Sequence, residues 1–230
     1  MWHSEFAYDP AADGMDQFGP IVGLSLTVSL SAALVAAVLG LGLAALLALT
    51  RFPGRRVLVV AVNALLGLPP VVVGLLLYLL LSHGGPLGGL GLLFTPGAMV
   101  AAQAILATPI VAALAHRVLE ADWVEYGRAL QASGASRWQA LWPLLGMGRR
   151  ALATAVLAGF GRTVSEVGAV LVVGGNIAGH TRTMTTAIAL ETSKGNLALA
   201  LALGMVLIGI SVAVSATVLV LGGQPERKRI

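Results

Sequence analysis

Five long apolar segments limit what this chain can fold into. A helix that crosses a bilayer needs roughly 17–25 mostly apolar residues, and each of these segments reaches that length. None alternates apolar and polar residues, which excludes the strands of a membrane barrel. The sequence therefore predicts an all-α membrane protein with five transmembrane helices. The predicted spans are Ile21–Leu49, Val57–Leu81, Ala98–Ala115, Ala151–Val173 and Leu197–Leu221.

The composition supports lipid as the solvent. Of the 230 residues, 57% are hydrophobic and 10% are charged, and the mean hydropathy is +0.91. A soluble domain carries about 25% charged residues, because its exterior has to be wetted. The chain has no cysteine, so disulfides, thiolate metal sites and cysteine nucleophiles are excluded.

The basic residues predict the orientation of the spans. Cytoplasmic loops of membrane proteins carry an excess of Lys and Arg. If the loops after the first and third spans face the cytoplasm together with the C-terminus, only Arg182 and Lys194 lie outside. The chain is therefore predicted to be N-out and C-in. Because the basic residues gather on the cytoplasmic side, the pI of about 10.1 does not indicate a nucleic-acid partner. The eleven basic residues predicted inside are Arg51, Arg55, Arg56, Arg117, Arg128, Arg137, Arg149, Arg150, Arg227, Lys228 and Arg229.

This topology divides the chain into three parts. Residues 1–20 are acidic and contain no Lys or Arg, the reverse of a signal peptide, and are predicted to form an extracytoplasmic tail. Residues 21–223 form the transmembrane domain, and residues 224–230 form a basic cytoplasmic tail. Because five spans are few for enclosing a path, a homodimer with the path on its two-fold axis is expected.

Small residues recur at four-residue spacing in the first and last spans. Such rows let helices approach closely in lipid. They fit packing within one chain, and they also fit a dimer interface. The rows are Ser25/Ser29, Ala33/Ala37, Gly40/Ala44/Ala48, Gly209/Ala213 and Ser211/Ser215.

The longest polar loop, residues 117–150, has the pattern of two short amphipathic helices. Apolar residues recur at helical spacing on both sides of a break that contains Gly134. Such a unit can insert into a groove of another protein. The same residues also suit a helix that lies on the lipid surface. A bulky residue at Gly134 is expected to overfill the turn.

The segment Arg128–Pro143 resembles the "EAA" loop of ABC importer permeases. In that family a Glu-Ala-Ala triplet is followed three residues later by glycine, and then by an apolar stretch ending at proline. Aligned on Gly134, Ala129 takes the first alanine position and Arg128 stands where glutamate is usual. The resemblance implies a coupling helix that docks in an ATP-binding subunit. The implied docking residues are Arg128, Ala129, Gly134, Ala135, Trp138, Leu141 and Pro143.

The fourth span contains the only charges within the five spans, Arg162 and Glu166. Residues four apart lie on one helix face and can pair. A charge near the middle of the bilayer costs about 2.5–3.5 kcal/mol on insertion scales, so both side chains are expected to face protein or water. The pair is consistent with a structural role and with a role in lining or gating a path for anions.

The segment Gly174–Thr181 nearly matches a phosphate-binding loop. We reject this match because His180 replaces the essential lysine, no strand precedes the segment, and the predicted topology places it away from ATP. No other such loop is present in the sequence, so another chain has to supply the energy.

The residues around this segment resemble the sulfate/molybdate/tungstate branch of ABC permeases. That branch reads Arg-x3-Glu-Phe-Gly-Ala, followed by Gly-Asn and Thr-x-Thr; here Val167 replaces the phenylalanine. The continuation Ala187–Asn196 is closest to tungstate permeases. The resemblance implies that the following residues line or gate the path: Arg162, Glu166, Gly168, Asn176, Thr181 and Thr183.

The family resemblance implies a type I ABC importer permease fold and a non-catalytic subunit that binds no cofactor itself. Its implied partners are two ATP-binding subunits and an extracytoplasmic oxyanion-binding protein. The implied location of the chain itself is the bacterial cytoplasmic membrane. Tungstate is the expected substrate, with molybdate, vanadate and sulfate as alternatives.

Two other functions compete with this interpretation. A stand-alone anion transporter or channel explains the spans and the charged pair, but it gives no reason for a docking loop. An intramembrane serine protease needs a base beside its nucleophile. The four histidines (His3, His83, His116 and His180) all lie at or outside the predicted membrane boundaries, and there is no His-Glu-x-x-His metal motif.

Overall fold

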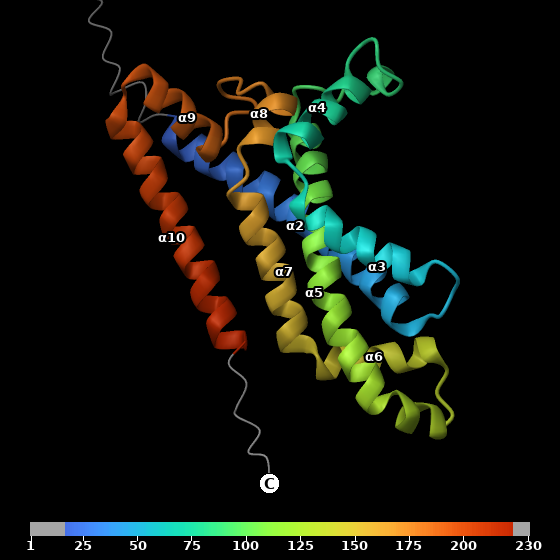
Figure 1. The fold of residues 1–230 in the computed structure, drawn as a ribbon. Coiled ribbons are helices and arrows are strands. Elements are labelled where there is room, and N and C mark those ends of the chain that lie inside the picture. Colours follow the sequence, from blue (N-terminus) through green and yellow to red (C-terminus); the bar gives the residue numbers. More distant parts are fainter. Residues whose placement is uncertain (1–16, 223–230) are drawn as a thin grey trace, which may run out of the picture.

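The computed structural model describes residues 17–222, and within this range the chain is helical, with no strand (Figure 1). This confirms the all-α prediction. Residues 1–16 of the predicted tail 1–20 and the whole predicted tail 224–230 lie outside the described range, and residues 18–20 already belong to the first helix. The helices are α2 (Phe18–Leu49), α3 (Arg55–Ala64), α4 (Pro70–Leu81), α5 (Pro96–Ala132), α6 (Arg137–Met147), α7 (Arg149–Val164), α8 (Gly168–Gly174), α9 (Met184–Lys194) and α10 (Leu197–Gly222), with short 3-10 helices at Leu65–Gly67 and Gly88–Leu90.

Three helices of the described range, α2, α5 and α10, are each long and apolar enough to cross a membrane. The second and fourth predicted spans are instead bent pairs. The helices on either side of Pro69 meet at 102°, and α7 and α8 meet at 57°. Prolines explain the first bend, because Pro69 and Pro70 lack the N–H groups that a continuous helix needs. The predicted count of five is reached when each bent pair is one crossing.

The centre of the molecule is the pair α2 and α5, which pack along one another. Gly40 makes this possible, because a Cβ there would lie 2.7 Å from the Cβ of Val111. The small-residue rows of α2 are largely buried within the chain, which confirms packing within the chain for that helix. The rows of α10 that contain Gly209 and Ser211 are exposed, so their role in a dimer stays a prediction.

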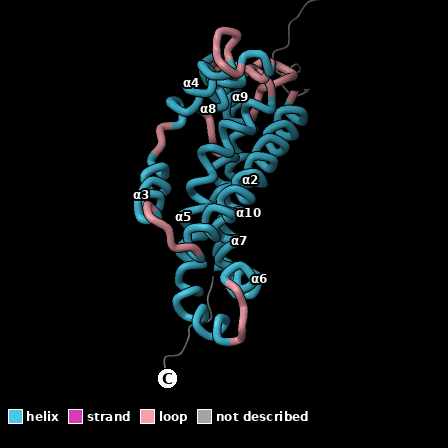
Figure 2. The backbone as a smooth tube through the Cα atoms, turned by 90° about the vertical axis from the view of Figure 1, so that its right-hand side faces the viewer, coloured by secondary structure: helices cyan, strands magenta, loops and turns pink. Residues whose placement is uncertain are grey.

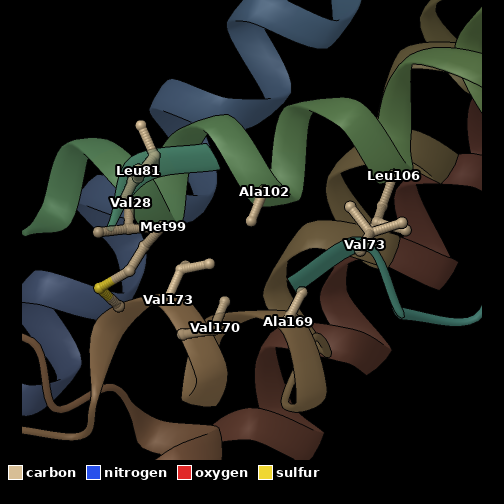
Figure 3. Packing of buried hydrophobic residues seen from close by; sticks show 10 residues of the cluster. Val28, Val73, Leu81, Met99, Ala102, Leu106, Ala169, Val170 and Val173 are labelled. Carbon is tan, nitrogen blue, oxygen red and sulfur yellow. The ribbon is translucent and has the colours of Figure 1, made fainter. Parts of the chain in front are cut away.

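Helices α4, α5 and α8 pack together at the end of the molecule where α8 and α9 lie (Figure 1). A Cβ on Gly74 of α4 would lie 2.9 Å from the Cα of Ala169 in α8, so these two helices touch almost backbone to backbone. Figure 3 shows Met99 and Ala102 of α5 beside Val170 and Val173 of α8. This apolar cluster holds α8 in place just after the bend.

Helix α10 stands apart from the rest of the bundle (Figure 1), and the most apolar part of its length is only 11% buried. A mostly apolar groove of about 540 Å³ separates it from α2 and α7. At the opposite end from α8 and α9, α6 lies across the ends of α5 and α7 (Figure 2). The two candidate sites therefore lie at opposite ends of the molecule.

Candidate functional site

The predicted docking segment begins on α5 itself. The sequence predicts two short helices in residues 117–150, but the first of them is wrong as a separate element. α5 runs without interruption for 37 residues, from the third span to Ala132. No proline or glycine between the span and Gly134 is sufficient to stop it: Gly127 is accommodated within the helix. The docking segment is thus rigidly continuous with a membrane helix.

The turn between α5 and α6 depends on Gly134, which has a φ of +88°. Nothing lies within 4 Å of a Cβ built there, so the expectation that a bulky residue overfills the turn is wrong. The requirement for glycine comes from the backbone conformation. Ser136 then caps α6: its hydroxyl accepts from the N–H of Gln139, and the Gln139 side chain accepts from the Ser136 N–H.

Helix α6 has one buried and one exposed face. Ala140 and Leu144 are fully buried against α2, α5 and α7, and Leu141 packs partly on the same cluster. On the other face, Trp138 is 53% exposed and Trp142 is 76% exposed. The remaining predicted docking residues are exposed or half-buried. They are Arg128, Ala129, Gly134, Ala135 and Pro143.

At the other end of the molecule, Arg162 and Glu166 form the predicted ion pair. An Arg162 nitrogen lies 2.6 Å from Glu166 Oε2, and the Glu166 side chain is only 2% exposed against 29% for Arg162. The pairing is confirmed, but the single continuous helix face predicted for it is wrong. α7 ends at Val164, and Glu166 lies in the bend before α8.

Glu166 also stabilises the bend. Its Oε1 accepts a hydrogen bond of 3.0 Å from the N–H of Ala169, one of the N–H groups at the start of α8 that have no partner within the helix. Its backbone carbonyl accepts a hydrogen bond of 2.8 Å from the hydroxyl of Thr185 in α9. The buried carboxylate of Glu166 therefore binds the Arg162 side chain of α7 and an N–H group of α8, and the backbone of Glu166 is hydrogen-bonded to α9.

The other predicted path residues are largely engaged within the chain. Gly168 is required sterically, since a Cβ there would lie 2.8 Å from Cγ2 of Val71. The buried Thr181 hydroxyl donates to the carbonyl of Gly174, and the buried Thr183 caps α9. Asn176 has a φ of +51° and donates to the Thr186 carbonyl, while its buried Oδ1 has no partner among the described residues.

Two polar contacts of α2 in this region were not predicted. The Thr163 hydroxyl lies 3.1 Å from the carbonyl of Ser29, and the Ser25 hydroxyl accepts a hydrogen bond of 2.6 Å from the N–H of Met184. The signal in the sequence was weak: serines in an apolar helix fit simple close packing equally well. Both contacts join α2 to the region of the bend.

Beyond the bend, Glu191 of α9 is buried at the end of its helix. Burial disfavours its charged form, but hydrogen bonds from Lys194 and Asn196 outweigh burial, so the pKa of Glu191 lies below its ordinary value. Across residues 17–222, no group of three or more His, Asp or Glu side chains could hold a metal ion.

Comparison with known proteins places these features in a family. Residues 20–221 match the family described as "Binding-protein-dependent transport system inner membrane component". The chain is 39% identical over 182 residues to a "Probable anion ABC transporter permease protein" of Haloferax volcanii, which covers 77% of this chain and 78% of that protein. It is 38% identical over 176 residues to the "Tungstate uptake system permease protein TupB" of Peptoclostridium acidaminophilum, covering 76% and 77%. It is 31% identical over 173 residues to the "Molybdenum transport system permease protein ModB" of Escherichia coli K12, covering 72% and 76%.

Proposed function

Because the chain belongs to the family of inner membrane components of binding-protein-dependent transport systems, as an ABC transporter permease, we propose that it forms the membrane path of an ATP-driven oxyanion importer. Tungstate is the proposed substrate. The tungstate uptake permeases compared are 38% and 42% identical to this chain, whereas the molybdenum permeases are 31% identical. The observation that carries the proposal is the exposed tryptophan face of α6, positioned by a helix that continues from the membrane.

The exposed face of α6 is the proposed contact with an ATP-binding subunit. Large apolar side chains that gather on a surface outside lipid mark an interaction site, and tryptophan is prominent among the residues that dominate binding energy at interfaces. Trp138 and Trp142 meet this description, and Arg128 and Pro143 lie exposed on the same segment. We assign the docking to the seven residues that the EAA resemblance implies.

The bend at Glu166 is the proposed element of the translocation path. In a bilayer, a break in a helix is tolerated only where it is covered by protein or lines a water-filled cavity. Arg162 keeps part of its side chain exposed while Glu166 is buried, so the arginine is the partner able to face an anion. In a two-fold dimer, two such arginines would offer a weak attraction to a dianion. A weak site suits transport, because a tight one would hold the anion back.

The proposed orientation has α6 inside and the loop between α4 and α5 outside. Ser136 and His83 are exposed residues at these two places. A single cysteine at His83 is expected to react with an impermeant maleimide in intact cells, and one at Ser136 only after the cells are opened. The reverse labelling pattern would overturn the orientation and remove α6 from the ATPase side.

Transport itself is tested with the purified permease, its ATP-binding subunit and its extracytoplasmic binding protein in liposomes. Uptake of labelled tungstate is expected to need all three proteins and to stop with a non-hydrolysable ATP analogue. Uptake by the permease alone, driven by an ion gradient, would instead establish the secondary transporter. Calorimetry of the binding protein with tungstate, molybdate, vanadate and sulfate then ranks the substrates, because that protein carries most of the selectivity in the proposed system.

A further inference from the structure

The end of α2 nearest α6 is held by two arginines from other helices. The last four carbonyls of a helix have no partner within it, and buried ones require donors. The Nε of Arg55 donates to the carbonyl of Leu47 over 2.6 Å, and a guanidinium nitrogen of Arg137 donates to the carbonyl of Leu49 over 3.2 Å. Both cations also lie at the negative end of the α2 dipole, where positive charge is stabilising.

Arg137 is the first residue of the proposed docking helix α6. Its hydrogen bond joins residues that are 88 positions apart in the sequence. Leu144 of α6 packs in the same region against Ala44 and Ala48 of α2. Apolar packing of this kind is not directional, whereas the Arg137 bond fixes where the start of α6 lies relative to the end of α2.

The far end of α2 is bonded to the bend that contains Glu166. The Thr163 hydroxyl, next to Arg162, lies 3.1 Å from the carbonyl of Ser29 and 2.8 Å from that of Phe160, and it can donate to either. The hydroxyl of Ser25 accepts a hydrogen bond from the first N–H of α9. Between these two ends, α2 is one 32-residue helix with its only proline, Pro20, in its first turn. α5 also connects the two ends, but it contains Pro109 in its interior, where the carbonyl one turn earlier lacks its usual donor. α2 is thus the stiffer connection.

We propose that Arg137 is a positioning residue for coupling: it ties α6 to α2, and α2 transmits displacement of α6 to the Arg162–Glu166 bend. This inference rests on the proposed function, because it presumes that an ATP-binding subunit moves α6. Arg137→Ala removes the tie but leaves both the buried apolar face of α6 and its exposed tryptophans in place.

The test uses the complete transporter in liposomes, with ATPase stimulation by the loaded binding protein and tungstate taken up per ATP as readouts. Arg137→Ala is expected to assemble with the ATP-binding subunit but to lose stimulation and uptake per ATP by about fivefold or more, the lower range of allosteric coupling between sites. Arg137→Lys is expected to recover part of the loss, because it keeps a charged donor without the planar fork.

The matched control is Arg149→Ala. Arg149 is the first residue of α7 and is exposed. Arg149→Ala removes the same charge as Arg137→Ala from the same end of the molecule, and this variant is expected to couple like the wild type. Equal losses in both variants, or normal coupling in Arg137→Ala, would overturn the assignment of Arg137.

A second variant tests the route and does not depend on α6 remaining docked. Thr163→Val keeps the shape of the side chain and removes the hydroxyl that contacts Ser29. It is expected to reduce tungstate uptake per ATP as well. If both residues act along one route, the double variant with Arg137→Ala should lose no more coupling than the single variant with the larger loss. Normal coupling in Thr163→Val, or additive losses in the double variant, would exclude α2 as the route. A wild-type transporter without any ATPase stimulation would instead overturn the proposed function along with the inference.

Discussion

The α6 end and the Arg162–Glu166 bend differ in which groups they expose and which they bury. At the α6 end, large apolar side chains are exposed, with Trp142 at 76%. At the bend, a charged carboxylate is buried to 2% exposure and is bonded to two separate partners. The apolar face of α6 is not covered by the rest of the chain, whereas the buried carboxylate already has its hydrogen-bond and ion-pair partners within the chain. The exposed face of α6 therefore fits the proposed contact with another protein, whereas the bend is held by contacts within the chain.

The largest expected effect on the stability of the permease comes from the buried carboxylate. Glu166→Gln leaves Arg162 without its counter-charge, and it should destabilise the chain by about 3 kcal/mol, the low end for broken buried pairs because Arg162 is partly exposed. The double variant Arg162→Met/Glu166→Gln should lose less. Thermal unfolding in detergent measures both, and strictly additive losses would show that the pair contributes no mutual stabilisation.

The same pair separates a structural role from a role in transport. Arg162→Met is expected to assemble with the ATP-binding subunit but to slow uptake of labelled oxyanion in vesicles. If the assembled variant transports at the normal rate, Arg162 serves structure alone. The bend would then have no role in transport, and the two ends of the molecule would differ only in which side chains are buried.

Packing at the bend predicts the next effect. Gly168→Ala places a methyl group 2.8 Å from Cγ2 of Val71, so the valine side chain or the packing of α4 on α8 has to shift, which should cost about 1–3 kcal/mol. Val71 is 56% exposed, so Val71→Ala alone should be nearly neutral, and the double variant should recover most of the loss. Thermal unfolding of the four proteins gives the coupling. A double variant as unstable as Gly168→Ala would contradict the steric explanation.

At the docking end, Gly134 predicts a smaller effect on stability. Leucine at a φ of +88° should cost about 1–2 kcal/mol, whereas Gly134→Asn should cost less because asparagine tolerates this conformation. Coupling to ATP hydrolysis should fall with leucine and stay near normal with asparagine. Wild-type stimulated ATPase activity in Gly134→Leu would refute the docking assignment of this turn.

The smallest expected effect on stability belongs to the most exposed tryptophan. Trp142→Ala should change the stability of the isolated permease by no more than about 0.5 kcal/mol, as for other exposed surface positions. Binding of the ATP-binding subunit should nevertheless weaken strongly. Pull-down with the purified ATPase measures this, and Val124→Ala, at a position that is also exposed, serves as the control outside the proposed docking residues. Equal binding by all three proteins would make the α6 face a lipid-contacting surface.

Much of the fold was predictable because it depends on quantities local in sequence. The length, high hydropathy and lack of charge of Ile21–Leu49 predict a membrane helix, whatever it packs against. The glycine of the α5–α6 turn and the four-residue spacing of Arg162 and Glu166 are also local, and both predictions are confirmed. The extent of α5 was missed, since polarity after Ala115 suggests a loop although nothing there stops a helix.

The membrane environment of this protein, its helical class, the approximate position of its apolar segments and its family are thus predictable from the sequence alone. The 57° bend between α7 and α8, the bond from Thr185 to Glu166 and the bond from Arg137 to Leu49 follow only from the tertiary structure. The physical reason is that apolar burial is set mainly by composition, whereas a hydrogen bond needs two groups at about 3 Å in the right direction. Which donor reaches which acceptor depends on how distant helices pack.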